Sequence, residues 1–186
     1  MKLLFLLFFL ISSTYCNTDI AESLKSVLDA YKPAKKCTFN YTEVNSKTIK
    51  FFPKCDTVYG IIVINENTDV SDSQLQKAFQ KMTSLYGGIR VENSNLTSLD
   101  IFSYDVGYNI FATKCEHYGI FILNNQNLTN VDFLWNVNQV DLGFVNECEF
   151  RVENNSKLDA ERLCDSGKMY QYMNLKVANN LRDCGK

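Results

Sequence analysis

The sequence predicts a single α+β domain built as a β-solenoid, in which short strands stack on one another through repeated turns. Three observations lead to this expectation. A short apolar strand recurs about every thirty residues, each copy ends in asparagine, and the segment Leu96–Asp100 after one copy matches Leu128–Asp132 after the next. One such unit cannot bury its apolar side alone, so a period of this length with one strand per unit is typical of stacked coils. The alternative, an ordinary α/β sandwich with chance similarity, is disfavoured by the matching segments.

Alternation within the strand copies indicates which side chains face inward, because successive residues of a strand point to opposite faces. The inward anchors are Ile62, Ile89, Ile120 and Phe150. The outward positions are Ile61, Val63, Asn65, Arg90, Glu92, Phe121, Leu123, Arg151 and Glu153. The asparagines that end the copies are Asn65, Asn93, Asn124 and Asn154. We expect them at corners, where Asn tolerates a left-handed backbone and bonds nearby backbone, and we expect the corners to stack in ladders.

Helical spacing occurs around these strands. Residues 71–85 place Leu75, Phe79, Met82 and Leu85 on one side, with Ser71 or Asp72 as the N-cap. Residues 19–31 show a similar pattern that ends before Pro33 and predict an N-terminal helix. We expect residues 159–181 to be helical in part and to close the end of the solenoid.

The first residues have the pattern of a secretory signal peptide. Lys2 precedes the apolar run Leu3–Ile11, and cleavage is expected after Cys16. That run is too short to span a bilayer, which needs roughly twenty residues, and no later run reaches that length. We therefore expect a signal peptide over residues 1–16, an N-terminal helical extension over 17–36 and the solenoid domain over 37–184, with the mature protein secreted and without a transmembrane segment.

Cysteines and glycosylation acceptors agree with an extracellular location. Seven cysteines are present, and removal of Cys16 leaves an even number in an oxidising compartment, which favours disulfides over metal or free thiols. Their connectivity cannot be deduced from counting. Acceptor triplets for N-glycosylation, which must face solvent when occupied, begin at Asn40, Asn95, Asn127 and Asn154.

Composition excludes several kinds of partner. The formal net charge is −2, and no Lys/Arg cluster appears in the sequence beyond Lys35 and Lys36, so nucleic-acid binding has no electrostatic basis. No CxxC pair is present and the chain has one histidine, so we expect no metal site and no cofactor.

Three motifs occur in order along most of the mature chain. The first is Cys37 followed after seventeen residues by Cys55-Asp-Thr-Val-Tyr-Gly-Ile-Ile-Val-Ile. The second is Tyr86-Gly-Gly-Ile-Arg-Val with Leu96-Thr-Ser-Leu-Asp-Ile-Phe, and the third is Phe150-Arg-Val-Glu-Asn-Asn-Ser-Lys-Leu leading to Cys164. In these motifs the chain resembles the receptor L-domain family, the module found twice in insulin-receptor and EGF-receptor ectodomains, and it looks closest to nematode secreted proteins that carry this module.

The resemblance implies a right-handed β-helix-like fold with helical caps. It also implies the pairings Cys37–Cys55 and Cys164–Cys184, which leave Cys115–Cys148. The sequence departs from the family pattern in the five residues between Leu158 and Cys164, where the family often has Cys directly after Leu. It also lacks the further modules of a receptor, so we expect no signalling across a membrane by this chain alone.

The outward strand residues are the candidate ligand-binding site, because the matching face of the insulin-receptor relatives contacts the hormone. We expect an exposed apolar centre of Val63, Phe121 and Leu123 with charges around it, as in many protein interfaces. The candidate residues are Val63, Asn65, Arg90, Glu92, Phe121, Leu123, Arg151 and Glu153. The alternative is that the apolar members lie under a cap or loop.

Other chemistry-bearing residues favour structural roles. His117 has no nucleophile motif beside it and is expected in a solvated turn. Asp100 and Asp132 recur at matching positions, which suggests turn bonding more than a catalytic pair. Trp135 is expected in the core or between turns. We therefore expect a non-catalytic, secreted protein-binding domain. By the family resemblance, it is expected to act as a soluble carrier or decoy for insulin-like or growth-factor-like peptides. The alternatives are a structural partner of other L-domain or matrix proteins and, remotely, a secreted glycan-active enzyme.

Overall fold

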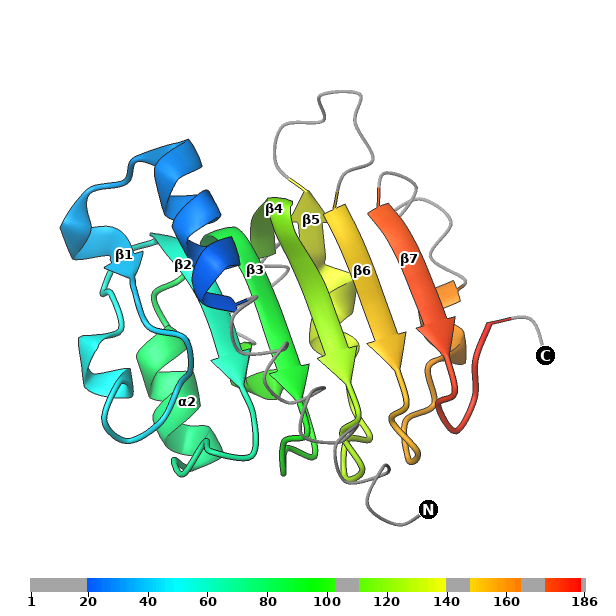
Figure 1. Cartoon of the computed structure of the whole chain (residues 1–186). Helices are drawn as coiled ribbons and strands as arrows, with labels where there is room; N and C mark the ends of the chain where they lie inside the picture. Colours follow the sequence, from blue (N-terminus) through cyan, green and yellow to red (C-terminus); the bar gives the residue numbers. More distant parts are fainter. Residues whose placement is uncertain (1–19, 103–110, 140–147, 165–172, 185–186) are drawn as a thin grey trace, which may run out of the picture.

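The computed structural model describes residues 20–102, 111–139, 148–164 and 173–184. The expected signal peptide lies outside the described residues. One seven-stranded sheet organises the rest, and every pair of neighbouring strands in it is parallel (Figure 1). Its order is β1 (Thr38–Phe39), β2 (Thr57–Ile64), β3 (Ser84–Glu92), β4 (Phe111–Leu123), β6 (Cys148–Glu153) and β7 (Met173–Ala178), while β5 (Val137–Gln139) pairs with the start of β4.

The register of the sheet aligns the four inward anchors. Ile62 is the partner of Ile89, Ile89 of Ile120, and Ile120 of Phe150. All four are at most 1% exposed and belong to the main hydrophobic core, which confirms their inward orientation. The architecture is thus α+β with one parallel sheet, and the closed right-handed β-solenoid stays a prediction.

Helices cover both faces of this sheet. The inner face packs against α2 (Asp72–Phe79) and short 3-10 helices, through core residues such as Leu75 and Phe79. The 3-10 helices are η1 (Lys35–Cys37), η2 (Ile49–Phe51), η3 (Asp100–Phe102), η4 (Asp132–Asn136) and η5 (Glu161–Cys164). A helix described over residues 20–31 lies on the opposite face, in front of β2 and β3 in Figure 1, and forms a second apolar cluster with Ile61 and Val63.

One helix prediction extends too far. Ser71 caps α2 in a capping box with Gln74, as expected, but the helix ends at Phe79. Ser84 already donates its N–H to the Asp56 carbonyl and continues as β3, because pairing with β2 satisfies the backbone that a longer helix would use. For the segment 159–181, which is expected to be helical in part, the described residues contain the 3-10 helix η5 and then β7, which pairs with β6.

Glycine is required where β2 and β3 come closest. Gly60 and Gly87 are register partners with φ of 148° and 140°, a region that residues with a side chain rarely adopt. A Cβ atom on Gly87 would meet the carbonyl oxygen of Gly60. The sheet therefore depends on the missing side chain at this position.

The corners after the strands are built by pairs of asparagines. Asn93, Asn124 and Asn154 have left-handed φ values of 51°, 58° and 60°, as predicted. Asn65 does not: its Oδ1 accepts from the Asn67 N–H at 2.9 Å, so it forms a side-chain turn instead.

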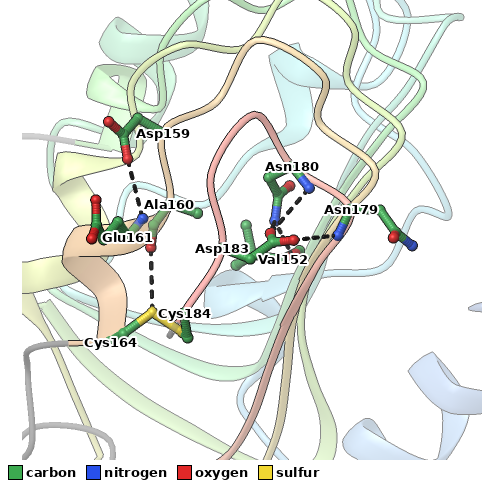
Figure 2. Close-up of a disulfide and its surroundings, with 9 residues drawn as sticks. All are labelled: Val152, Asp159, Ala160, Glu161, Cys164, Asn179, Asn180, Asp183 and Cys184. Atoms are coloured by element: carbon green, nitrogen blue, oxygen red, sulfur yellow. Dashed lines mark hydrogen bonds between the residues drawn. A yellow bond between two sulfur atoms is a disulfide. The ribbon is translucent and has the colours of Figure 1, made fainter. Parts of the chain in front are cut away.

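The ladder itself is formed one residue further on, by Asn125, Asn155 and Asn180. The Asn155 Oδ1 accepts from the backbone N–H of Asn125 at 2.9 Å, and its Nδ2 donates to the Ile122 carbonyl at 3.0 Å. Asn180 repeats both contacts: its Oδ1 accepts from the Asn155 N–H at 3.1 Å, and its Nδ2 donates to the Val152 carbonyl at 2.8 Å. Figure 2 shows the second of these contacts. Asn125 and Asn155 are fully buried, so these amides replace water for the strand ends.

Candidate binding face of the sheet

The outer face is the name we give to the side of the sheet that points away from the main core. Register places Val63, Arg90, Phe121, Arg151 and Lys176 in one row across β2, β3, β4, β6 and β7. A second row contains Glu92, Leu123, Glu153 and Ala178. The parallel sheet thus brings together the sequence-predicted site residues of four strands, and Asn65 lies just past the end of β2.

The N-terminal helix covers the β2 part of this face. Leu24 and Val27 pack with Ile61 and Val63, and Val27 is fully buried. Val63 is 4% exposed, and Phe121 and Leu123 are each 8% exposed. The expected exposed apolar centre is therefore wrong, and for Val63 the reason is the helix, whose apolar side is satisfied by the sheet.

Tyr31, the last residue of this helix, packs against β3 and β4. Its hydroxyl donates to Glu116 Oε1 at 2.7 Å, and its ring meets Tyr86 and His117 edge-on at 5.3 and 5.4 Å between centroids. Burial, together with the hydrogen bond to Glu116, raises the pKa of the Tyr31 hydroxyl above its ordinary value. His117 is exposed but lies in β4 against Tyr31, and not in a solvated turn.

On β3 and β4 the charges are satisfied within the face. Arg90 forms an ion pair with Glu92 at 2.6 Å and donates to the Tyr118 hydroxyl at 3.3 Å. Its guanidinium carbon also lies 5.7 Å from the centre of the Phe121 ring, within the range of a cation–π contact. Because Tyr118 packs edge-on against the same ring, Phe121 is held between these groups.

The most open charges lie on β6 and β7. Arg151 forms two contacts with the Glu153 carboxylate, at 3.1 and 2.6 Å, and Lys176 reaches the same carboxylate at 3.0 Å. The side chains of Arg151 and Lys176 are 32% and 63% exposed, whereas that of Glu153 is 9% exposed. The hydrogen bond from Arg151 lowers the pKa of the Glu153 carboxyl.

We expect Glu153→Gln to lose less stability in acid than the parent protein does. Because the folded-state pKa of Glu153 is lowered, its contribution is present above the ordinary pKa of about 4.3 and is lost as pH falls through the folded value. Urea unfolding midpoints at several pH values from about 7 down to about 3 measure the difference. Glu66→Gln removes an exposed carboxylate at the far corner and serves as the control. Parallel curves for Glu153→Gln and the parent would contradict this assignment.

Sequence reasoning missed Lys176 and Tyr118. Lys176 falls in the segment that we expect to be helical in part, although the polar and apolar alternation of residues 174–177 indicates a strand. Tyr118 precedes Gly119, where the predicted strand copy begins, and β4 extends eight residues further toward the N-terminus, to Phe111.

The remaining candidates have structural surroundings. Asp100 and Asp132 are exposed, and each contacts a side chain of the following turn at 3.5 Å: Asn130 for Asp100 and Arg162 for Asp132. The half-buried Trp135 ring has the Arg162 guanidinium 5.6 Å from its centre. These contacts between turns fit the structural interpretation of the three residues.

Disulfides close the domain at three places. The bonds are Cys37–Cys55, Cys115–Cys148 and Cys164–Cys184, which are the pairs that the family resemblance implies. Cys115–Cys148 joins the adjacent strands β4 and β6, and Cys164–Cys184 closes the C-terminal end (Figure 2). The acceptor residues Asn40, Asn95, Asn127 and Asn154 are all exposed, as glycosylation would require.

Within residues 20–102, 111–139, 148–164 and 173–184, no helix combines the length and apolarity needed to cross a bilayer. Across the same described ranges, no group of three or more His, Cys, Asp or Glu side chains is placed to hold a metal ion.

Comparison with known proteins assigns the family. The model of the receptor L domain matches residues 54–175, from just before β2 into β7, and the N-terminal helix lies outside the match. A search of the curated proteins finds no match to the chain. The matched stretch is well over half of the chain and contains most of the sheet and of the outer face. The chain therefore belongs to the receptor L domain family, which is a family of binding domains and not a known family of enzymes.

Proposed function

We propose that this protein is a secreted, non-catalytic extracellular binding domain that holds a protein or peptide ligand on the part of the outer face left open by the N-terminal helix. The row Arg90, Phe121, Arg151 and Lys176 carries the proposal. Neighbouring strands lie about 4.8 Å apart, so the row forms a continuous strip roughly 14 Å wide. Its Arg90 and Phe121 end is packed and mostly buried, and its charges become increasingly open toward β7.

The position of the helix supports β6 and β7 as the contact region. The helix occupies the surface of β2, while Arg151 and Lys176 remain accessible. Their partner Glu153 holds both cations in place, which reduces the side-chain entropy that binding would otherwise cost. A ligand with exposed carboxylates complements the accessible cations Arg151 and Lys176.

We further propose that the protein is a soluble carrier or decoy for an insulin-like or growth-factor-like peptide, as its membership of the receptor L domain family suggests. A structural role is the second candidate, favoured by β7, which is the last strand of the sheet order and could pair with another L-domain or matrix protein. The in-register parallel strands and the asparagine ladder support our further proposal that the coils close into a right-handed solenoid.

The experiment is capture of ligands from extracellular fluid by the secreted, oxidised protein, followed by identification with mass spectrometry. The variant Glu149→Lys, Lys176→Glu exchanges two exposed charges on the open strands without changing net charge. The control Glu22→Lys, Lys25→Glu makes the same exchange on the solvent side of the N-terminal helix. We expect the parent and the control to capture a small cysteine-rich peptide and the face variant to bind it at least about tenfold more weakly.

The outcomes separate the two candidates. If the face variant captures that peptide as well as the parent does, the peptide does not bind to the open strands β6 and β7. If only large extracellular proteins are captured, or nothing is captured, the peptide-carrier proposal fails and the structural role becomes the better interpretation.

A further inference from the structure

A groove beside α2 gathers four lysines that are far apart in the sequence. Lys50 belongs to η2 and Lys54 follows it, while Lys77 lies in the last turn of α2 and Lys81 just beyond it. All four are exposed and line one cavity of about 500 Å³ between the two helices. The chain as a whole is slightly acidic, so the charge here is local. Sequence inspection missed the cluster because folding, and not adjacency, brings the lysines together.

The lysines of this groove lack the carboxylate partners that the outer face provides. Among the described residues, no ion pair joins any of the four to Asp or Glu, and no carboxylate lines the cavity. Lys77 and Lys81 lie near the C-terminal end of α2, where cations stabilise a helix. Lys50 lies in the short η2 with its ammonium 5.1 Å from the centre of the Phe51 ring, and Lys54 lies outside both helices. Four like charges around one cavity repel one another, so an anion bound between them would be favourable.

The floor and walls of the groove restrict the kind of anion. Ile49 and Ala78 are half-buried and supply apolar surface, while Gln74 and Gln80 supply uncharged hydrogen-bonding groups. Among the described residues that line the groove, the one aromatic ring is that of Phe52, which is 6% exposed and offers no platform on which a nucleic-acid base could stack. The same lining residues include no arginine, so they lack the planar fork that binds a phosphate with two parallel hydrogen bonds.

We propose that this groove binds a sulfated polysaccharide. Lysines are point charges that suit sulfate groups spread along a chain, and the apolar floor suits the C–H faces of sugar rings. Three disulfides indicate an oxidising, extracellular setting in which such glycans occur. Because α2 packs on the inner side of the sheet, the groove is separate from the outer face and does not depend on the function proposed for it.

The test measures binding of the full secreted protein to a heparin dodecasaccharide at increasing salt. The groove variant replaces Lys50, Lys54, Lys77 and Lys81 by glutamine. The control replaces four exposed lysines elsewhere, Lys25, Lys36, Lys47 and Lys157, and so has the same net charge. We expect the parent and the control to bind in a salt-sensitive manner and the groove variant to bind about tenfold more weakly or not at all. Thermal unfolding confirms that both variants are folded.

Two further probes exclude other polyanions. Single-stranded oligonucleotide and polyglutamate of matched charge should bind the parent more weakly than heparin does. If the control and the groove variant lose heparin binding equally, net charge alone explains the loss, and the proposal of a binding site in this groove is wrong. Binding of either other polyanion as tightly as heparin would overturn the assignment to a sulfated polysaccharide.

Discussion

Replacing Asn155 by leucine is expected to lower the free energy of unfolding by about 2–5 kcal/mol. The leucine side chain has the same branching and number of heavy atoms with somewhat bulkier methyl groups, and every hydrogen bond of the amide is lost. The N–H of Asn125 and the carbonyl of Ile122 then lose partners in a fully buried corner. Each buried group left unsatisfied costs on the order of 1–3 kcal/mol. Urea unfolding of the oxidised protein measures the loss.

Two comparisons isolate the hydrogen bonds as the cause. Asn174→Leu makes the same change on the exposed part of β7 and should alter stability by less than about 0.5 kcal/mol. Asn155→Asp keeps the acceptor oxygen but removes the donor to Ile122, so its effect should also be large. The change at Asn155 leaves the glycosylation acceptor at Asn154 intact, because the middle residue of the triplet can vary. A loss below about 1 kcal/mol for Asn155→Leu would show that the ladder contributes little.

Gly87→Ala is expected to destabilise the protein by about 2–5 kcal/mol, or to prevent its secretion. One methyl group must enter the space beside the Gly60 carbonyl, and the backbone would have to leave its φ of 140°. Both strands pair on either side of this point, so relief by local movement would break the register of β2 with β3. Secretion yield and the urea unfolding midpoint measure the effect.

The matched control for Gly87 lies in the same strand. Ser84→Ala also places alanine in β3, at a half-buried position with no unusual backbone requirement, and should change stability by less than about 1 kcal/mol. If Gly87→Ala unfolds at the same urea concentration as the parent, the close approach of the two strands is not important for stability.

The strands were predictable because their signal is local and repeated. Alternation identified Ile62, Ile89, Ile120 and Phe150, and parallel register then aligned them without further information. The corners at Asn93, Asn124 and Asn154 followed from the backbone preference of asparagine. Ends of elements were less predictable, because pairing of Ser84 with β2 decides where α2 must stop, and that contact is non-local.

The environment of the outer face could not be predicted from the strands alone. The apolar side of helix 20–31 was visible in the sequence, but its destination on Ile61 and Val63 depends on packing between distant segments. The same holds for the pairing of Glu153 with Lys176 and for the meeting of Lys50 with Lys77 across a groove. Periodicity states which side of an element is apolar and does not state what will cover it.

The asparagine ladder also has a direction. At each step the backbone N–H donates toward the C-terminus: Ser94 and Asn125 to the next side-chain oxygen along, Asn155 to Asn180 at 3.1 Å, and Asn180 to Asp183 at 3.0 Å. Hydrogen bonds in such a series polarise one another, so the last N–H groups are strong donors. The Asp183 carboxylate accepts from both Asn179 and Asn180 beside the last disulfide (Figure 2). The series therefore ends on a full negative charge that a further coil would have to bury. Extra coils are consequently easier to insert within the stack than to append after Asp183.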